Sequence, residues 1–464
     1  MMRSNSVRDG ASLRKKMFVA VAVAALGIVA THLLFQVTAS KKNAEVIAAW
    51  DGDLGSWDDV MQRYPSRAAN GAAKELEQIA ATLGVAMATR GVIDAPGPDG
   101  GPSAPDDDYA TRTKMRVMPG DEAKAAFDTM KKPVFEWVDR ELRRVGGEIE
   151  PMPAEGNAYF EENAPIFSAF RRELLLGEAP EWEMQLEKLF AAPIPNLLGQ
   201  ITMQRLLAAE ALRHERGGRH GLALETVEAA WRLNGALRDS PILISQLIAA
   251  ANARYVAATL RRFDHVPADW VSRLAEHDVR EGMIVALKFE GWIWPHASER
   301  HLLSAHGTDE WTSRLVGRIA APVMRLGLAE MSANWQAEVG SLPPDAESCG
   351  EGASAFDVEI SWWNYIGKIA VPNLSNALDR ADRAAVDLEL TRKWIALDAA
   401  RRRNAGEWPE DLPFPETLDA CPEERLVYEV SGDGAATLAV AREIDWGKTN
   451  GLALPLRVAG STTM

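Results

Sequence analysis

Three of the eight histidines recur every five residues, at His296, His301 and His306. Regularly spaced imidazoles could form a metal site or a catalytic site. On a helix this spacing turns successive imidazoles about 140° apart, whereas two metal ligands on one helix face stand three or four residues apart. Glu299 forms such a pair only with His296, and a polar helix start beside Pro295 is the simpler interpretation. We therefore expect neither a metal site nor a cofactor site in this segment.

The local signatures of common enzyme classes are absent from the sequence: HExxH, GxSxG, GxxxxGK[ST] and a strand-turn-helix GxGxxG. An enzyme would need a catalytic group and its partner brought together from distant positions. For that alternative the residues to consider are His296 and His301 with scattered carboxylates. The acidic segment from Asp51 to Asp59 lacks the ligand order of a calcium loop. We interpret it as a membrane-proximal turn whose Trp50 and Trp57 favour the interface.

Tryptophan side chains could form a binding surface. The sequence holds 15 tryptophans, among them the near-pair Trp292 and Trp294 and the adjacent pair Trp362 and Trp363. Aromatic-lined grooves hold sugars, peptides or proline-rich segments, so these four residues form the predicted interaction surface. Adjacent side chains on a helix cannot face the same way, so at least one of Trp362 and Trp363 is expected to cover the core. Packing in the core or between helices is the favoured interpretation of both pairs, and a binding surface is the alternative.

The two cysteines, Cys349 and Cys421, lie in segments that read as loops, DAESCGEGAS and ETLDACPEER. In an oxidising compartment this pair can close into a disulfide, worth about 4 kcal/mol on the chain-entropy model. Two unpaired thiols are the alternative. Because no CxxC occurs, thioredoxin-like redox chemistry and cysteine-based zinc sites have no support.

The compartment of these residues follows from an apolar segment near the N-terminus. Met17 to Val37 contains no Asp, Glu, Lys or Arg, and as a helix it can cross a hydrocarbon core of about 30 Å. Five basic residues precede it and two follow closely, which predicts a cytoplasmic N-terminus and an exported chain. We expect a single-pass anchor at 17–38 in a bacterial inner membrane, with the rest in the periplasm. Cleavage between Ala39 and Ser40, as for a signal peptide, is the alternative.

Size and charge limit the function. With 464 residues, 47% of them hydrophobic, the chain can bury a substantial core in two or three packed units. Its 66 acidic and 51 basic residues give a net charge of −15, which argues against binding nucleic acid. The densest basic runs, at 261–262 and 401–403, are interpreted as charges near helix C-termini.

The elements that must position these residues form a mainly α fold. Asn70 is placed to cap a helix, a flexible Pro- and Gly-rich loop spans 94–108, and a helix from Asp121 to Val145 is expected to break or kink at Pro133. Short connections after residue 157 favour antiparallel helices. The expected parts are a cytoplasmic N-terminus at 1–16, the anchor at 17–38, membrane-proximal helices at 39–156, a helical body at 157–404 and a C-terminal module at 405–464.

One stretch of the body, Glu210 to Asn234, resembles the second half of a tetratricopeptide repeat. Gly218 stands at the turn between two helices, and the small residues Ala223 and Ala230 let the helices approach closely. Because no second clear copy follows at a 34-residue period, we expect a TPR-like hairpin within an irregular α-solenoid or bundle.

The C-terminal module changes character. The segments RLVYEV and AATLAVA read as strands joined by a turn at 431–434, which predicts a β-hairpin. A lone hairpin is marginally stable in water, so it should pack against the preceding helix, Ser375 to Asn404.

Several motifs together resemble a family of uncharacterised bacterial single-pass membrane-anchored helical proteins. They are the N-terminal anchor, RYPSRAANGAAKELEQIAATLGV, the long segment from IPNLLGQITMQ to AAANARY, TRKWIALDAARRRNAGEWPEDL and CPEERLVYEV. The helix, Trp-Pro, Asp-Leu and strand pair near the C-terminus are also similar to the helix-to-sheet junction of pseudopilins, but here that helix is not the N-terminal anchor. The resemblance implies architecture and supplies no reaction, cofactor or catalytic residue.

Two function classes follow. The first is a noncatalytic scaffold, with a helical surface held beside the membrane that binds a partner protein of the envelope. The second is a hydrolase-like envelope enzyme with a site built from His296 or His301 and a carboxylate. The absence of every local signature favours the scaffold.

Overall fold

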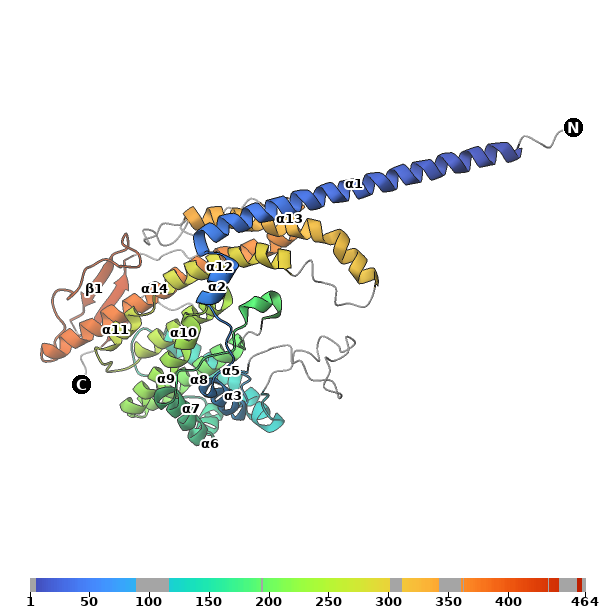
Figure 1. Cartoon of the computed structure of the whole chain (residues 1–464). Helices are drawn as coiled ribbons and strands as arrows, with labels where there is room; N and C mark the ends of the chain where they lie inside the picture. The colour runs from blue at the N-terminus through green and yellow to red at the C-terminus, as the bar shows by residue number, and fades with distance from the viewer. Residues whose placement is uncertain are drawn as a thin grey trace. The chain divides into compact units, whose positions relative to one another are not determined.

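The chain is mainly helical, with a small antiparallel sheet near its C-terminus (Figure 1). It divides into two compact units. Unit 1 comprises Met1–Trp57, Gly291–Ala337 and Val358–Val371, and unit 2 comprises Asp58–Glu290, Glu338–Asp357 and Pro372–Met464. The computed structural model describes residues 6–88, 117–192, 195–300, 311–341, 360–361, 363–432, 434–441 and 457–460. The loop predicted at 94–108 lies outside these residues.

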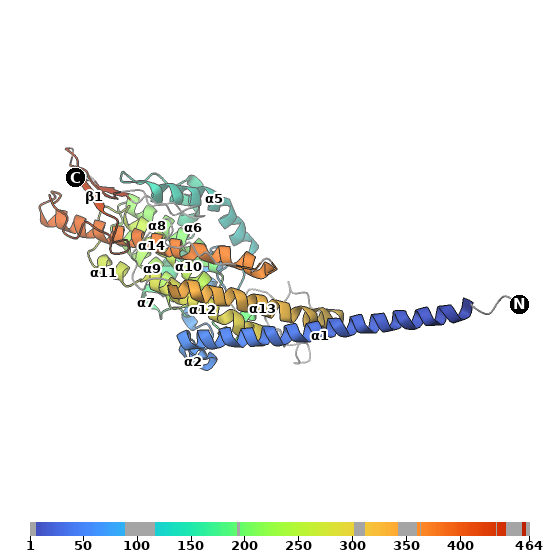
Figure 2. The same cartoon turned by 90° about the horizontal axis from the view of Figure 1, so that it is seen from above.

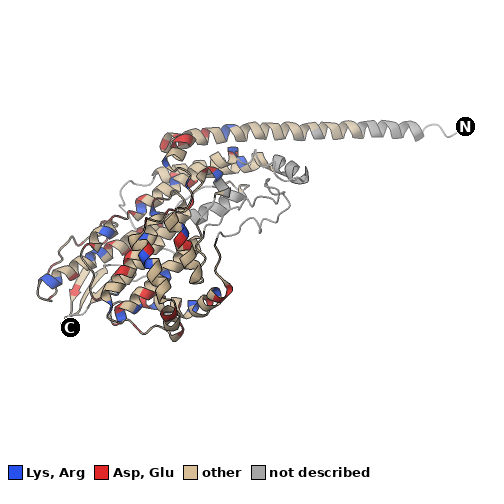
Figure 3. Cartoon of the chain, turned by 60° about the horizontal axis from the view of Figure 1, so that its bottom comes forward, with Lys and Arg blue, Asp and Glu red and all other residues tan. Residues whose placement is uncertain are grey.

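Unit 1 begins with one long helix, α1 (Ser6–Leu54, 49 residues). Its part Met17–Leu54 is long and apolar enough to cross a membrane, and Figure 3 shows little charge along most of it. The sequence analysis separated an anchor at 17–38 from membrane-proximal helices that begin at 39, whereas α1 continues across that boundary to Leu54. The polar residues after Ser40 include no proline or glycine before Gly52, so nothing breaks the backbone hydrogen bonds and the helix continues.

The C-terminal part of α1 packs in unit 1 along one stripe. Ala39, Asn43, Val46 and Trp50 are buried, and their spacing of three or four residues places them on one helix face. They face α12 (Val279–Arg300), whose last turns belong to unit 1, and α13 (Trp311–Ser341). A Cβ at Gly291 would lie 2.3 Å from the Trp50 ring, so glycine is required at this contact.

Pro295 lies inside α12, which corrects the expected helix start beside it. A proline removes the N–H that would bond the carbonyl four residues earlier, here that of Gly291. The Ser332 hydroxyl of α13 donates to that carbonyl at 2.6 Å and accepts from the Trp50 Nε1–H at 2.8 Å. The hydroxyl replaces the missing helical bond, so the helix tolerates the proline.

Unit 2 contains most of the described helices. The helix α5 (Asp121–Arg143) runs through Pro133 without interruption, so the expected break is wrong and the alternative, a kink, stays a prediction. The carbonyl freed at Thr129 lies on an exposed turn. The elements are α2 (Trp57–Arg63, its first residue in unit 1), α3 (Gly71–Thr82), α5 (Asp121–Arg143), α6 (Ala154–Glu162), α7 (Ala164–Leu176), the 3₁₀ helix η1 (Leu186–Ala191), α8 (Leu197–Arg216), α9 (His220–Arg238), α10 (Leu243–Leu260), α11 (Trp270–Ala275) and α14 (Tyr365–Arg403, in unit 2 from Pro372).

The helices α8 and α9 form a helical hairpin, as the spacing of small residues indicated. Gly218 has φ +69° in the turn between them, a conformation that favours glycine. Ala223 and Ala230 of α9 are buried, and α10 packs against both helices (Figure 2). These three helices form the centre of unit 2.

The C-terminal sheet packs on α14. The predicted hairpin is present as β1 (Leu426–Val430) and β2 (Ala436–Val440), paired antiparallel with Leu426 opposite Val440. A third strand, β3 (Arg457–Gly460), joins β2 and was not predicted. One buried cluster unites helix and sheet, and among its members are Val386, Leu390, Trp394, Leu397, Leu438 and Val458.

Candidate functional site

A cleft of about 820 Å³ in unit 2 is the candidate functional site. Clefts of 300–1,000 Å³ are the usual size of ligand sites. Its walls come from the corner between α11 and α12, the end of α13 around Gly340, the middle of α14 and the segment at Asp419. The site is thus assembled from four parts of the chain that lie far apart in sequence.

A helix cap orders one wall of the cleft, and a buried ion pair joins the two helical walls. Asp278 caps α12, because its carboxylate accepts from the Glu281 N–H at 2.8 Å. Two residues later in the chain, Arg280 forms an ion pair with Asp382 of α14, and the two side chains are 12% and 4% exposed. Burial raises the pKa of Asp382, and the neighbouring Arg280 opposes that rise. The pair joins α12 to α14 across the cleft.

The third wall is held by Glu389 and Lys393, one turn apart on α14. The buried Glu389 carboxylate accepts from the backbone N–H groups of Asp419 and Ala420 at 2.7 and 2.8 Å. Lys393 contacts Glu389 at 3.2 Å and donates to the Thr417 carbonyl at 2.7 Å. The Glu389–Lys393 pair therefore bonds the backbone N–H groups of Asp419 and Ala420 and the Thr417 carbonyl. These bonds fix this loop against α14.

His277 places a neutral imidazole in the wall. It is 7% exposed, and burial, with a smaller effect of Arg238, lowers its pKa to about 3. Its ring lies edge-on to Trp231, with 6.0 Å between centroids. Among the described residues its Nδ1 has no hydrogen-bond partner. This atom is itself buried, so His277 contributes the edge of a neutral ring to the wall rather than a free polar group.

The chemistry of the cleft suits binding. The half-buried Ile284 and Val285 provide apolar contact, while Asp278, Glu281 and Asp419 are exposed acids at its rim. Lys288 and Arg392 also line it, so acids outnumber bases. Among the residues that line the cleft, all within the described chain, there is no serine, threonine or cysteine.

The structure brings two predicted site residues, His296 and Trp292, against one carboxylate, in unit 1 rather than in the cleft. His296 Nε2 lies 3.0 Å from Asp51 Oδ1, which also accepts from the Trp292 Nε1–H at 3.1 Å. Trp57 stacks on Trp292 with 5.4 Å between ring centroids. Burial lowers the pKa of His296, and Asp51 opposes this effect. The other histidine considered, His301, lies outside the described residues.

The tryptophans occupy different environments. Trp292 is fully buried, so its ring is not exposed for a partner, whereas Trp294 and Trp363 are half-buried. Trp362 lies outside the described residues. Trp50 is fully buried, which corrects its expected place at the membrane interface. Its Nε1–H bonds the Ser332 hydroxyl, and that internal partner explains the burial.

Cys421 is buried beside the loop that Glu389 holds, and it is disulfide-bonded. Cys349 lies outside the described residues, so the pairing of Cys349 with Cys421 stays a prediction. Among the described residues no group of three His, Cys, Asp or Glu side chains is arranged to hold a metal ion.

Sequence reasoning missed the cleft. One local signal was available, because Asp278 and Glu281 have the spacing of a helix-capping pair and mark the start of α12. The Arg280–Asp382 pair joins residues 102 positions apart, and no local pattern reveals such a contact.

Comparison with known proteins adds no relative: no protein-family model, no curated protein and no solved structure matches this chain.

Proposed function

We propose that this chain is a membrane-anchored helical scaffold of the bacterial envelope, and that the cleft in unit 2 binds an extended segment of a partner protein. The proposal rests on the cleft itself. The buried ion pairs Arg280–Asp382 and Glu389–Lys393 hold its walls in place without a bound partner. Preorganised walls lower the cost of ordering on binding. The proposed segment carries lysine or arginine toward Glu281 and Asp419, and apolar side chains toward Ile284.

The proposed location depends on α1. The apolar part of this helix serves as the anchor, and the basic residues before Met17 favour a cytoplasmic N-terminus with both units in the periplasm. Removal of the segment as a signal peptide would leave the units exported but free of the membrane. The TPR-like hairpin of α8 and α9 supports the scaffold class, because paired helices of this kind build extended binding surfaces in repeat proteins.

Charge reversal in the cleft tests the proposal. The full-length protein, crosslinked in native membranes, should recover one stoichiometric envelope partner, and Glu281→Lys with Asp419→Lys should abolish that recovery. The matched control is Glu225→Lys, which makes the same change at an exposed position of α9 away from the cleft. Equal recovery by the cleft variant and the control would exclude the cleft as the binding site.

A hydrolase-like envelope enzyme is the second candidate, and the Asp51–His296 contact is the observation that favours it. A carboxylate bonded to an imidazole orients the ring for general acid–base work. An enzyme of this kind would lose its hydrolytic activity on envelope substrates in both Asp51→Asn and His296→Gln, while Glu281→Lys would keep it. Loss of partner recovery only in the cleft variants would favour the scaffold.

A further inference from the structure

A groove of about 550 Å³ runs between α1 and α13 within unit 1. It is lined by Ala24, Gly27, Thr31, His32 and Phe35 of α1 and by Pro322 and Val323 of α13. The hydroxyl of Thr31 donates to the Gly27 carbonyl at 2.8 Å, so that its polar group is already bonded within the helix. The surface that remains is mostly apolar.

The groove continues the packing contact between the same two helices. Farther along α1, the two helices meet through Trp50 with Ser332 at 2.8 Å and through Ser40 with Arg325 at 2.9 Å. Figures 1 and 2 show α13 beside this part of α1. Toward the N-terminus of both helices the contact opens, and Val323 is 46% exposed. The groove is therefore a wedge between helices that are joined at one end.

The position of the wedge along α1 indicates what surrounds it. Gly27 and Phe35 lie within the apolar run of α1, where the neighbouring Leu26, Val29 and Leu34 are 69%, 55% and 69% exposed. If this run spans a bilayer, those side chains face hydrocarbon, and Val323 lies beside the same stretch of helix. Apart from the His32 imidazole, the wedge offers water few hydrogen-bond partners at that depth, so lipid is the favoured occupant.

We propose that a phospholipid acyl chain fills this wedge, and that the Pro322–Val323 turn of α13 is a second point of contact with the membrane. The inference rests on the proposed anchor. Arg325, one turn beyond Pro322, is buried and donates to the Ser40 hydroxyl, so this contact closes the end of the wedge nearer the membrane surface. Unit 1 is then held to the bilayer by two helices rather than by α1 alone.

Depth-dependent quenching tests the proposal in the full chain. A fluorescent label on Val323→Cys, in vesicles of phosphatidylcholine and phosphatidylglycerol, should be quenched by lipids with a nitroxide on the acyl chain and protected from aqueous iodide. The same label on Val29→Cys gives the quenching expected of the anchor in lipid. On Leu176→Cys, whose side chain is 82% exposed in unit 2, the label gives the quenching expected in water. Unmodified protein treated with the reagent measures labelling of the native cysteines.

The outcomes separate the wedge from the anchor. Lipid quenching at Val29 together with iodide quenching at Val323 would overturn the wedge and leave the anchor standing. Iodide quenching at both positions would overturn both proposals. A second variant, Gly27→Leu, fills open space, because a Cβ at Gly27 meets nothing within 4 Å. It should reduce lipid quenching of the Val323 label at least twofold without changing that of Val29, and an unchanged Val323 signal would exclude an acyl chain from the wedge.

Discussion

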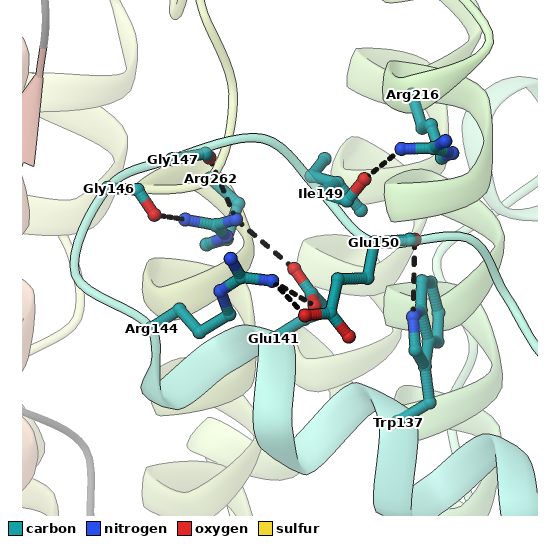
Figure 4. Close-up of polar contacts among 9 residues, drawn as sticks. All are labelled: Trp137, Glu141, Arg144, Gly146, Gly147, Ile149, Glu150, Arg216 and Arg262. Carbon is teal, nitrogen blue, oxygen red and sulfur yellow. Dashed lines mark hydrogen bonds and ion pairs between the residues drawn. The ribbon is translucent and has the colours of Figure 1, made fainter.

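Replacing Arg262 by methionine should destabilise unit 2 more than any exposed ion-pair variant. Figure 4 shows this side chain, just beyond the end of α10, reaching the end of α5 and the loop after it. The guanidinium lies 3.1 Å from the Glu141 carboxylate and donates to the carbonyls of Gly146 and Gly147 at 2.7 and 3.0 Å. The side chains of Arg262 and Glu141 are 2% and 0% exposed.

The magnitude follows from this burial. Arg262→Met leaves the Glu141 charge with Arg144 alone, a partner 38% exposed at 3.3 Å, and leaves two loop carbonyls without their donor. Breaking a buried pair in this way costs about 3–5 kcal/mol. Burial also lowers the pKa of Arg262, the sign expected of a cation held away from water.

Urea unfolding of the full chain, followed by circular dichroism, measures the effect. The matched control is Arg144→Met, which removes a half-exposed partner of the same glutamate and should cost about 0–1 kcal/mol. In the double variant Glu141→Gln with Arg262→Met, the loss should be smaller than the sum of the single losses, because the two groups interact. A cost for Arg262→Met no larger than that for Arg144→Met would refute the reasoning.

Three further predictions concern buried groups. The pKa of His277 falls to about 3 in the folded state, below about 6.5 when unfolded, so the unfolded chain binds more protons between these values. Stability should therefore drop by up to about 1.4 kcal/mol per pH unit as pH falls through that window, and His277→Gln should remove this slope in pH-dependent urea titrations. Ser332→Ala should cost about 1–3 kcal/mol in the same unfolding assay, because it leaves the buried Gly291 carbonyl without its donor; an unchanged midpoint would contradict the account of Pro295. Peptide mass mapping without reductant should recover Cys349 linked to Cys421, and Cys421→Ser should lower the unfolding free energy by about 4 kcal/mol.

Local patterns predicted the elements that depend on neighbouring residues. The cap at Asn70 is confirmed, because its side chain accepts from the Ala73 N–H at 2.9 Å. The turn at Gly218 and the pairing of β1 with β2 are also present, since each depends on a few residues close in sequence. The burial of Ala223 and Ala230 likewise follows from their spacing on one helix face.

Features that depend on distant residues escaped prediction. Pro295 stays within α12 only because Ser332, from another helix, supplies the missing donor. The strand β3 is short and gains its partners from β2, which precedes it in the chain. The cleft depends on the pairing of Arg280 with Asp382, and this contact appears only once the helices are packed.

Site-specific photocrosslinking in living cells is the most direct test of the proposed scaffold. A photoreactive amino acid at Ile284, within the cleft, should join the full-length protein to one envelope protein, and the same residue at Glu225 should not. The linked peptide of that partner should contain lysine or arginine. Equal crosslinking from both positions, or crosslinks from Glu225 alone, would contradict the assignment of the cleft as the binding site.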